Sequence, residues 1–433
     1  MNIENIYQIY KQFPLVTTDS RVCPENSIFF ALRGDNFNGN RFAQAALDKG
    51  CAYAVVDEAE FAGNKRIILV ENVLETLQKL ANLHRKTLGT KIIGITGTNG
   101  KTTTKELIAA ILSQKFNTLY TQGNLNNHIG VPLTLLQLTA NHEIAIIEMG
   151  ANHPHEIAEL CAIAEPNFGI VTNVGKAHLE GFGSFEGVMR TKAEIYDFIS
   201  QKGGKVFINQ DNNYLLKMAE DAGLTDKSLL KYSLTDRNAT VYGKIISVSP
   251  FLQMNLYSSS QYTPAHTHLV GSYNAENLLA AFSVGHHFGV SVRKMGPFLE
   301  KYVPTNNRSQ YAETQKNKLI IDAYNANPSS MAEAIRNFAQ IEAGEKTLIL
   351  GDMLELGETS AEEHQEIVNL LNENGFSEVF LVGKNFQSTK SDFTTFENPG
   401  ELIDFLKDKK LENRLILIKG SHSMKMEKTV EFL

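Results

Sequence analysis

The chain has 433 residues, of which 42% are hydrophobic and 21% are charged, and its 41 basic and 48 acidic side chains give a formal net charge of -7. This composition is typical of a folded globular enzyme and excludes disorder as the main state. The net negative charge argues against broad nucleic-acid binding, which needs clustered lysine and arginine, so no nucleic-acid partner is expected. At roughly 150 residues per domain, the length predicts about three domains.

No apolar run reaches the roughly 18 residues that would cross a bilayer. The first residues also lack the basic and then apolar layout of a secretion signal. We therefore expect a cytoplasmic protein without membrane insertion. The three cysteines are too few and too scattered to predict a disulfide framework or a closed zinc site.

The first region, residues 1–88, alternates short apolar runs with helical patterns. The apolar runs are Ser27 to Leu32, Tyr53 to Val56 and Ile67 to Val70, and the helical patterns are Phe42 to Lys49 and Leu74 to Arg85. This alternation predicts a small α/β domain.

The second region, residues 89–303, contains further apolar runs that are separated by helical patterns. These runs are Lys91 to Ile95, Ile144 to Ile147, Gly169 to Val174 and Lys205 to Asn209. Such runs favour a mostly parallel sheet that is covered on both faces. Ligands of such a sheet bind beyond the carboxyl ends of its strands.

The alternation restarts in the third region, residues 304–433, which predicts a Rossmann-like domain. The predicted strands are Leu319 to Ala323, Thr347 to Leu350, Val379 to Val382 and Leu415 to Ile418. Asn327 stands as the N-cap of the first helix and Pro328 as its first residue. The whole chain is thus predicted to be an α/β protein of three domains, with a hinge near residues 304–308.

A phosphate-binding loop lies between a predicted strand and a predicted helix. It consists of Gly97, Thr98, Asn99, Gly100, Lys101, Thr102 and Thr103. Glycines let backbone N–H groups turn toward one anion, Lys101 reaches the outer phosphates, and Thr102 can ligate Mg²⁺. The alternative is a glycine-rich turn with a surface lysine. We favour nucleotide binding because strand, loop, lysine, hydroxyls and helix occur in the required order.

Two further polar residues follow predicted strands. Glu148 ends the run Ile144 to Ile147, where a carboxylate could hold Mg²⁺ or could simply be solvated. His178 follows the next strand, and its alternative role is that of an ordinary packing residue.

Several motifs together closely resemble the Mur ligases of bacterial cell-wall synthesis. They are the loop Gly97 to Thr103, the stretches Gly123 to Pro132, Glu148 to Ala151, Ala177 to Ser184 and Asp322 to Ser329, and Leu350 to Met353. Within the family, the last two stretches are similar to those of the branch that adds D-alanyl-D-alanine to a UDP-N-acetylmuramoyl-tripeptide.

The resemblance implies an ATP-dependent ligase that makes an amide bond through an acyl phosphate, in peptidoglycan precursor synthesis. Its substrates would be the UDP-linked muramoyl tripeptide and the dipeptide. Catalysis would rest mainly on positioning and on charge neutralisation by Lys101 and Mg²⁺.

The resemblance also assigns roles around the phosphates. Thr102 and Glu148 would hold Mg²⁺, and His178 would help to bind a second ion. Lys192 matches a lysine that such ligases carry as a carbamate. From sequence alone it is a surface lysine on the helical pattern Phe185 to Ile199. Carbon dioxide attacks only a neutral amine, so the carbamate needs neighbours that depress the pKa of Lys192.

The remaining implied contacts are with ATP and the two substrates. The expected nucleotide contacts are Asn274, Asn277, Arg308, Asp322, Tyr324 and Asn325. The expected substrate contacts are Asp19, Ser20, Arg21, Arg33, Asn38, Asn126, Lys419 and Ser421. The first five would receive the uridine diphosphate sugar, and Lys419 and Ser421 the acceptor dipeptide.

Two alternatives stay open at this point. One is a Mur-type or folylpolyglutamate-type ligase with another amino-acid acceptor. The other is an ATP-binding switch without catalysis, which would have little need of Glu148, His178 and Lys192 around its phosphate loop. A monomer is expected in either case.

Overall fold

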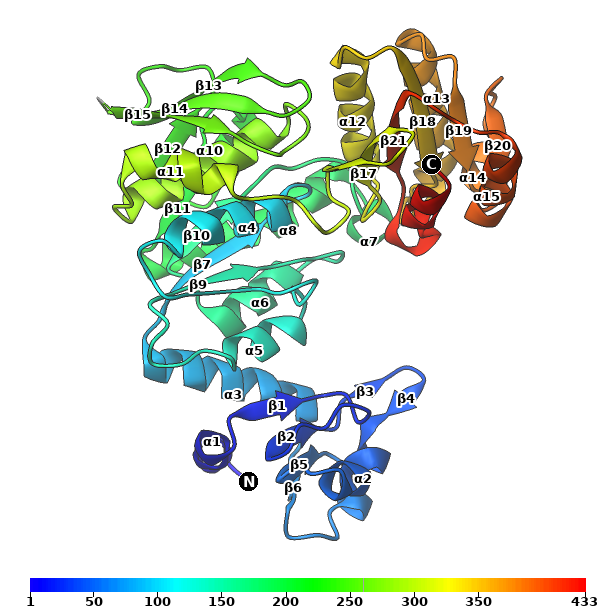
Figure 1. The fold of residues 1–433 in the computed structure, drawn as a ribbon. Helices are drawn as coiled ribbons and strands as arrows, with labels where there is room; N and C mark the ends of the chain where they lie inside the picture. Colours follow the sequence, from blue (N-terminus) through cyan, green and yellow to red (C-terminus); the bar gives the residue numbers. More distant parts are fainter. Residues whose placement is uncertain (260) are drawn as a thin grey trace.

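In the part of the chain that the structure describes, the strands form three large sheets and one two-stranded ribbon. The computed structural model describes residues 1–259 and 261–433. The sheets follow one another along the chain, from blue through green to red in Figure 1, and helices lie against their faces. The predicted α/β class is confirmed.

The first sheet is parallel throughout and has the strand order β1-β2-β5-β6. Its strands are β1 (Leu15–Thr17), β2 (Ser27–Phe30), β5 (Tyr53–Val56) and β6 (Ile67–Leu69). The ribbon pairs β3 (Arg33–Gly34) with β4 (Phe37–Asn38), and the helices are α1 (Ile3–Gln12), α2 (Ala43–Asp48) and α3 (Val73–Leu88). All three predicted strands are present, whereas α1 and β1 lie outside the predicted elements.

Helix α3 joins the first region to the second. Asn72 accepts a hydrogen bond from the backbone of Glu75 at its start, and Gly89 ends it in the left-handed conformation at φ +68°. The buried side chains of α3 belong to one hydrophobic core with residues of the first sheet and of the second region. This core continues from the first region into the second, so it does not mark a division at residue 88. The boundary there stays a prediction.

The central sheet has nine strands in the order β15-β14-β13-β12-β11-β10-β7-β9-β8. They are β7 (Lys91–Thr96), β8 (Thr118–Tyr120), β9 (Ile144–Glu148), β10 (Phe168–Val171), β11 (Lys205–Asn209), β12 (Leu229–Ser233), β13 (Val241–Ser247), β14 (Gln253–Ser258) and β15 (Gln261–His266). Neighbours from β8 to β13 pair in parallel, and β13, β14 and β15 pair antiparallel. The prediction of a mostly parallel sheet is confirmed, while β12 to β15 lie outside the predicted elements.

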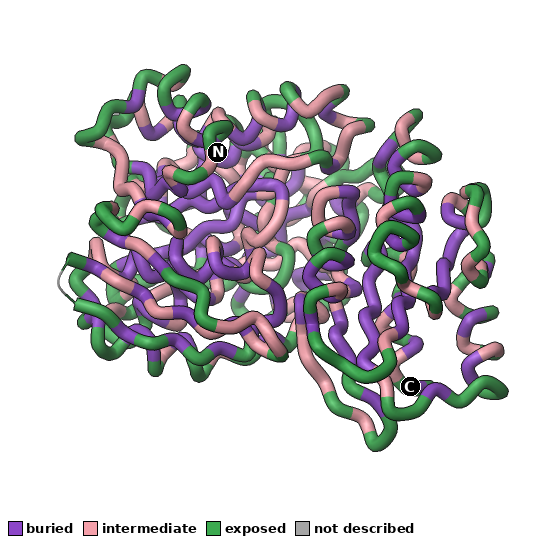
Figure 2. The backbone as a smooth tube through the Cα atoms, turned by 90° about the horizontal axis from the view of Figure 1, so that it is seen from above, coloured by how far each residue is buried: buried purple, intermediate pink, exposed green. Residues whose placement is uncertain are grey.

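Helices cover both faces of the central sheet. They are α4 (Lys101–Leu112), α5 (Gly130–Leu135), α6 (Glu156–Ala164), α7 (Leu179–Phe182), α8 (Phe185–Lys202), α9 (Asn213–Asp221), α10 (Asn274–His287) and α11 (Val292–Glu300). The buried residues of α4, α10 and α11 form one core, and those of α5, α6, α8 and α9 form another. Strands β7, β9, β10 and β11 between these cores are buried along nearly their whole length, and Figure 2 shows such buried stretches of the backbone in purple.

The third sheet has the order β16-β17-β21-β18-β19-β20 and is parallel except for β16. Its strands are β16 (Gln310–Glu313), β17 (Lys318–Asp322), β18 (Glu345–Gly351), β19 (Val379–Val382), β20 (Thr394–Phe396) and β21 (Arg414–Lys419). Its helices are α12 (Pro328–Gln340), α13 (Ser360–Glu373), α14 (Lys384–Gln387) and α15 (Pro399–Asp408). As predicted, Asn327 caps α12, with Pro328 as its first residue.

Within residues 1–259 and 261–433, no helix combines the length and the apolar character that crossing a bilayer requires. The carboxyl ends of β7, β9 and β10 lie together at one edge of the central sheet, because these strands are parallel neighbours. This edge is where the predicted phosphate loop begins.

Candidate active site

The phosphate loop connects β7 to α4 and depends on two glycines. Gly97 has φ +140° and Gly100 has φ +77°, both outside the range that other residues adopt easily. A Cβ atom on Gly97 would lie 2.0 Å from the Thr172 hydroxyl, and one on Gly100 would lie 2.4 Å from Asn277 Oδ1. The loop therefore requires glycine at both positions.

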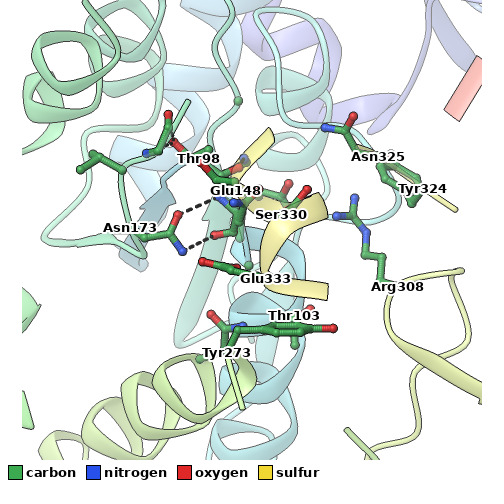
Figure 3. Close-up of a pocket in the computed structure, with 18 of the residues that line it drawn as sticks. Thr98, Thr103, Glu148, Asn173, Tyr273, Arg308, Tyr324, Asn325, Ser330 and Glu333 are labelled. Carbon is green, nitrogen blue, oxygen red and sulfur yellow. Dashed lines mark hydrogen bonds between the residues drawn. The ribbon is translucent and has the colours of Figure 1, made fainter. Parts of the chain in front are cut away.

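Residues at the end of β10 hold the loop in shape. The backbone N–H of Asn99 donates to Asn173 Oδ1 at 2.9 Å, and the Thr172 hydroxyl donates to the Asn99 carbonyl at 2.6 Å. The backbone N–H of Thr98 donates to the Asn173 carbonyl at 3.0 Å. Figure 3 shows Asn173 beside the loop. The strand predicted to run to Val174 ends at Val171, since the next two residues turn toward this loop.

Lys101 is the first residue of α4 and folds back over the loop. Its ammonium donates to the carbonyls of Gly97 at 2.7 Å and Thr98 at 3.0 Å. Burial lowers the pKa of Lys101 to about 8, although the nearby Glu148 carboxylate opposes this shift. The loop thus carries a positive group at its centre.

Among the residues that the structure describes, three oxygen atoms at or beside the loop are buried without a hydrogen-bond partner, and one of them is the hydroxyl of Thr96 at the end of β7. The other two are the hydroxyl of Thr102, a residue 3% exposed, and Oε2 of Glu148, a residue 1% exposed. Most buried polar atoms in proteins have a partner, so such a pair indicates a missing ligand. Hydroxyl and carboxylate oxygens are ligands that suit Mg²⁺.

Glu148 ends β9 and is held by two side chains. Asn126 Nδ2 donates to its Oε1 at 2.9 Å, and Lys105 Nζ lies 3.5 Å from its Oε2. Burial raises the pKa of Glu148, but the cations Lys105 and Lys101 outweigh this effect, and the net shift is downward. Asn126 therefore contacts this carboxylate, and its contact with substrate stays a prediction.

Lys192 lies on α8 and is 2% exposed, not a surface residue. Its ammonium donates to the Ala151 carbonyl at 3.3 Å and lies 5.3 Å from the centre of the Phe182 ring. Burial, assisted by repulsion from Lys101, lowers the pKa of Lys192 to about 7. A large fraction of this amine is therefore neutral near pH 7.

The third region contacts the central one through His178. Its Nδ1 pairs with the carboxylate of Glu355, which lies between β18 and α13. Hydrogen bonding to His178 lowers the pKa of Glu355. Nearby, the Lys176 ammonium donates to Glu363 Oε1 at 2.7 Å. The predicted metal ligand His178 thus stands at a contact between two regions of the chain.

Two asparagines at the start of α10 contact the helix of the phosphate loop. Asn277 Oδ1 accepts from the Thr104 hydroxyl at 3.1 Å, and its Nδ2 donates to Asn274 Oδ1 at 2.9 Å. Asn274 Nδ2 in turn donates to the Val270 carbonyl at 2.8 Å. Both residues are buried and form part of the pocket wall.

Arg308 and the end of β17 form the opposite wall. The Arg308 guanidinium lies 3.6 Å from the centre of the Tyr324 ring, and Figure 3 shows the two side chains near each other. Asp322 Oδ1 accepts from the backbone N–H of Ser309 at 3.2 Å, and its Oδ2 accepts from Lys419 Nζ at 2.6 Å. Lys419 is 2% exposed, so this ion pair fixes it in the wall.

These walls enclose one large cleft of ≈ 1290 Å³. The predicted site residues that line it are Thr98, Asn99, Gly100, Lys101, Thr103, Asn126, Glu148, His178, Asn274, Asn277, Arg308, Asp322, Tyr324, Asn325 and Lys419. The cleft therefore brings together predicted residues from the central and third regions. Gly97, Thr102 and Lys192 lie behind its surface.

Comparison with known proteins identifies the family. The model described as "Mur ligase middle domain" matches residues 95–285, "Mur ligase, glutamate ligase domain" matches 307–422, and "Mur ligase family, catalytic domain" matches 12–85. A Bacillus subtilis protein named "UDP-N-acetylmuramoyl-tripeptide--D-alanyl-D-alanine ligase" is 32% identical, with 96% of this chain and 92% of that protein covered. The chain belongs to the Mur ligase family.

Solved structures of Mur ligases agree with this assignment. MurF from Acinetobacter baumannii has a TM-score of 0.85 at 30% identity, with 96% of this chain and 92% of that one covered. MurF from Thermotoga maritima in complex with ADP has a TM-score of 0.85 at 26% identity and covers 96% of both chains. The family expected from the motifs is confirmed.

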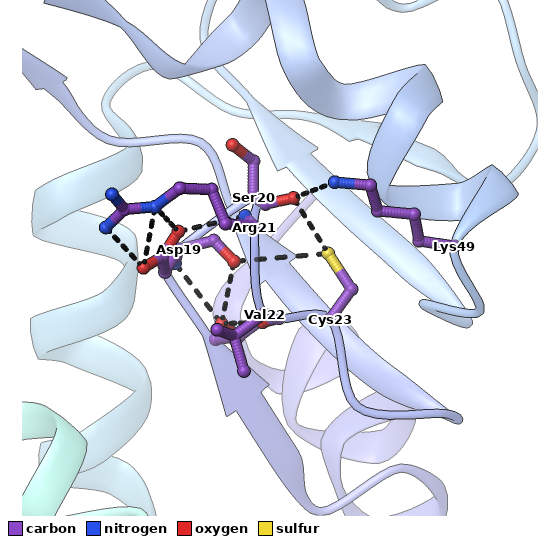
Figure 4. Close-up of polar contacts among 7 residues, drawn as sticks. Asp19, Ser20, Arg21, Val22, Cys23 and Lys49 are labelled. Atoms are coloured by element: carbon purple, nitrogen blue, oxygen red, sulfur yellow. Dashed lines mark hydrogen bonds and ion pairs between the residues drawn. The ribbon is translucent and has the colours of Figure 1, made fainter.

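The N-terminal residues predicted to bind substrate lie outside the cleft of this Mur ligase. Arg21 Nη2 pairs with Asp19 Oδ2 at 2.8 Å, and Lys49 Nζ donates to the Ser20 carbonyl at 2.7 Å, as Figure 4 shows. The hydrogen bond and charge of Arg21 lower the pKa of Asp19 to about 2. This loop pairs mainly within itself.

Three other predicted substrate residues also have partners away from the cleft surface. Arg33 pairs with Glu58 at 3.1 Å, and Asn38 Nδ2 donates to the same carboxylate at 2.9 Å. The Ser421 hydroxyl is buried and accepts from the backbone N–H of Leu354 at 3.0 Å. Their predicted contacts with substrate are not tested by this geometry.

Sequence reasoning missed several residues of this Mur ligase site. Asn173 holds the phosphate loop, Lys105 pairs with Glu148, and Glu276 lines the cleft. A usable signal existed for Lys105, because it stands three and seven residues before Ile108 and Leu112 and therefore falls on the apolar face of the predicted helix. No comparable signal marks Glu276, whose neighbours come from distant segments.

Proposed function

We propose that this Mur ligase joins D-alanyl-D-alanine to a UDP-N-acetylmuramoyl-tripeptide at the cost of ATP, in peptidoglycan precursor synthesis. The observation that carries the proposal is the shared cleft in which the phosphate loop, Glu148 and His178 meet residues of the third region. The relative from Bacillus subtilis, aligned over 96% of this chain, supports the choice of substrates.

An amine does not displace oxide from a carboxylate directly, because oxide is a very poor leaving group. The carboxylate must therefore be activated first. A carboxylate oxygen of the tripeptide attacks the γ-phosphorus of ATP, ADP leaves, and an acyl phosphate forms. The amine of the dipeptide then attacks the acyl carbon, inorganic phosphate leaves, and an amide remains. Lys101 neutralises charge that gathers on the transferred phosphoryl oxygens.

Thr102 and Glu148 are proposed to hold Mg²⁺, since each presents a buried oxygen without a partner. In the described ranges, no group of three or more His, Cys, Asp or Glu could hold an ion. Phosphate oxygens of ATP are therefore expected to complete the ligand set. When bound, the ion would supply positive charge that offsets the negative charge of the phosphate oxygens.

Lys192 is proposed to carry a carbamate. Its buried position and its pKa of about 7 favour the neutral amine that carbon dioxide requires. The modified side chain would supply an anionic oxygen ligand for a second cation beside His178. To bind that cation, His178 would have to give up its contact with Glu355.

The other assignments divide the substrates among the regions. Asn274, Asn277, Arg308, Asp322, Tyr324 and Asn325 are proposed to contact ATP. The loop of Asp19, Ser20 and Arg21, with Arg33 and Asn38, is proposed to receive the uridine diphosphate sugar, and Asn126, Lys419 and Ser421 the reacting peptides. We also propose that the domains divide at residues 88 and 303 and that the protein is a monomer.

The test is phosphate release by the purified full chain with ATP and Mg²⁺. Release should require both the nucleotide-linked tripeptide and the dipeptide. Equal release without either substrate would contradict the ligase. Release with L-glutamate in place of the dipeptide would favour a folylpolyglutamate-type acceptor, and nucleotide binding without any release would favour the switch.

A second test addresses Lys192. The variant Lys192→Ala should lose ligation and regain part of it when a small carboxylic acid is added. Lys202→Ala, on the exposed end of the same helix, is the matched control and should keep full activity. An undiminished Lys192→Ala enzyme would contradict the carbamate.

A further inference from the structure

Lys105 is a buried charge with no role in the function proposed above. It lies on α4, one helical turn after Lys101, and its side chain is 1% exposed. Lysine is almost never fully buried unless a partner compensates its charge. The position of this ammonium therefore needs an explanation.

The only acid paired with Lys105 in residues 1–259 and 261–433 is Glu148. Its Nζ lies 3.5 Å from Glu148 Oε2, and the Glu148 side chain is 2% exposed. Asn126 occupies the other oxygen, Oε1, at 2.9 Å. The carboxylate is thus fixed from two sides, by an amide and by a cation.

The contact with Lys105 balances the negative charge of Glu148 but does not occupy Oε2, the oxygen that is proposed to bind the cation. Glu148 Oε2 has no hydrogen-bond partner, so Lys105 attracts it at ion-pair distance only. A lone pair of this oxygen stays available for a cation. Lys101, by contrast, is bonded to the carbonyls of the loop and would be drawn toward phosphates.

We propose that Lys105 is a positioning residue that compensates and orients Glu148 when no divalent cation is bound, and that it thereby weakens the retention of that cation. The proposal rests on the proposed role of Glu148 as a metal ligand. A buried carboxylate that has lost its countercharge is strongly destabilising. Without Lys105, the carboxylate would keep only the weaker attraction of Lys101 and Arg308, and a bound divalent cation would supply the missing countercharge.

The test is thermal unfolding of the full chain with and without Mn²⁺, with the Mn²⁺ affinity measured by electron paramagnetic resonance. Lys105→Met should lower the unfolding midpoint by roughly 5 °C without metal. Mn²⁺ should restore most of this loss and should bind roughly tenfold more tightly than to the unaltered chain. Lys105→Arg should keep the original behaviour, because it keeps the charge.

Matched variants make the result specific. Lys115→Met, an exposed lysine just beyond α4, should leave the response to Mn²⁺ unchanged. The double variant Lys105→Met with Glu148→Gln should regain stability without metal and lose its response to Mn²⁺. If Lys105→Met alone does not fold, a folded double variant supports the proposal, and an unfolded one overturns it.

Other outcomes also decide the matter. A Lys105→Met chain with unchanged midpoint and unchanged Mn²⁺ response would overturn the proposal, as would an equal loss of stability in the Glu148→Gln background. A Mn²⁺ affinity that Glu148→Gln does not alter would overturn it too. Ligation by the unaltered enzyme is measured separately, so each of these failures is distinguishable from failure of the proposed function.

Discussion

The phosphate loop is predicted to bind ATP and the N-terminal loop around Arg21 to receive the uridine diphosphate sugar, and the two loops are built differently. The first is fixed by hydrogen bonds from β10 and by glycines that tolerate no Cβ atom. In the second, the Arg21 side chain is 87% exposed and pairs with Asp19 two residues away. The fold itself organises the first loop, whereas a ligand can reorganise the second at little cost.

The largest effect is expected at the phosphate loop itself. Lys101→Met removes a charge that, about 4 Å from a phosphate oxygen at an effective dielectric of 20, contributes about 4 kcal/mol, or nearly three decades in rate. We expect kcat/KM for ATP to fall by about that factor. Lys115→Met is the control, and a loss of less than tenfold in Lys101→Met would contradict a direct role.

A glycine substitution tests how rigidly the loop is held. Gly100→Ala adds left-handed strain and a contact of 2.4 Å with Asn277, which together should cost about 3 kcal/mol of unfolding free energy. Gly89→Ala has a similar φ, +68°, but nothing within 4 Å, and should cost about 1 kcal/mol. Urea unfolding measures both, and equal costs would show that the contact with Asn277 is unimportant.

Glu276 lies at the cleft wall and should make the free energy of unfolding depend on pH. Burial, with repulsion from Glu333 and Asp211, raises its pKa from 4.5 to about 7. Between pH 4.5 and about pH 7, Glu276 stays protonated in the folded chain but is ionised in the unfolded chain. The stabilising contribution of Glu276 to the free energy of unfolding is therefore lost as the pH rises through this range.

Glu276→Gln should remove that dependence. Relative to the unaltered chain, the variant should gain about 2 kcal/mol of unfolding free energy between pH 5 and pH 8. Urea titrations at several pH values measure this difference. Parallel stability curves for the two chains would mean that Glu276 does not titrate in this range.

The smallest effect on stability is expected in the N-terminal loop. Arg21→Ala should leave the unfolding midpoint unchanged, because the ion pair with Asp19 is exposed. If the loop binds the diphosphate, KM for the nucleotide-linked tripeptide should rise about tenfold. Arg66→Ala, another exposed arginine of the first region, should change neither quantity. An unchanged KM for Arg21→Ala would remove this loop from the substrate site.

Elements with a strong local pattern were predictable from the sequence. The runs around Ile93 and Ile146 became buried parallel strands, and Asn327 with Pro328 began α12 as expected. Strands β13 to β15 were not predicted, because none of them is a continuous apolar run: β14 and β15 alternate buried and more exposed residues, and β13 does so only at its start. The extended backbone there is fixed by pairing between strands, which a local pattern does not reveal.

The site was predictable where a motif specifies a backbone shape, as at Gly97 and Gly100. Contacts between distant segments were not predictable. The pairing of Lys105 with Glu148 joins α4 to β9, and the pairing of His178 with Glu355 joins two regions of the chain. Such contacts depend on how the elements pack, so only the folded chain reveals them.

The most direct test of the central claim uses a tripeptide substrate labelled with ¹⁸O in its reacting carboxylate. If the carboxylate attacks ATP, one labelled oxygen should appear in each inorganic phosphate released as the amide forms. Unlabelled phosphate, accompanied by full formation of the amide product, would contradict activation through an acyl phosphate.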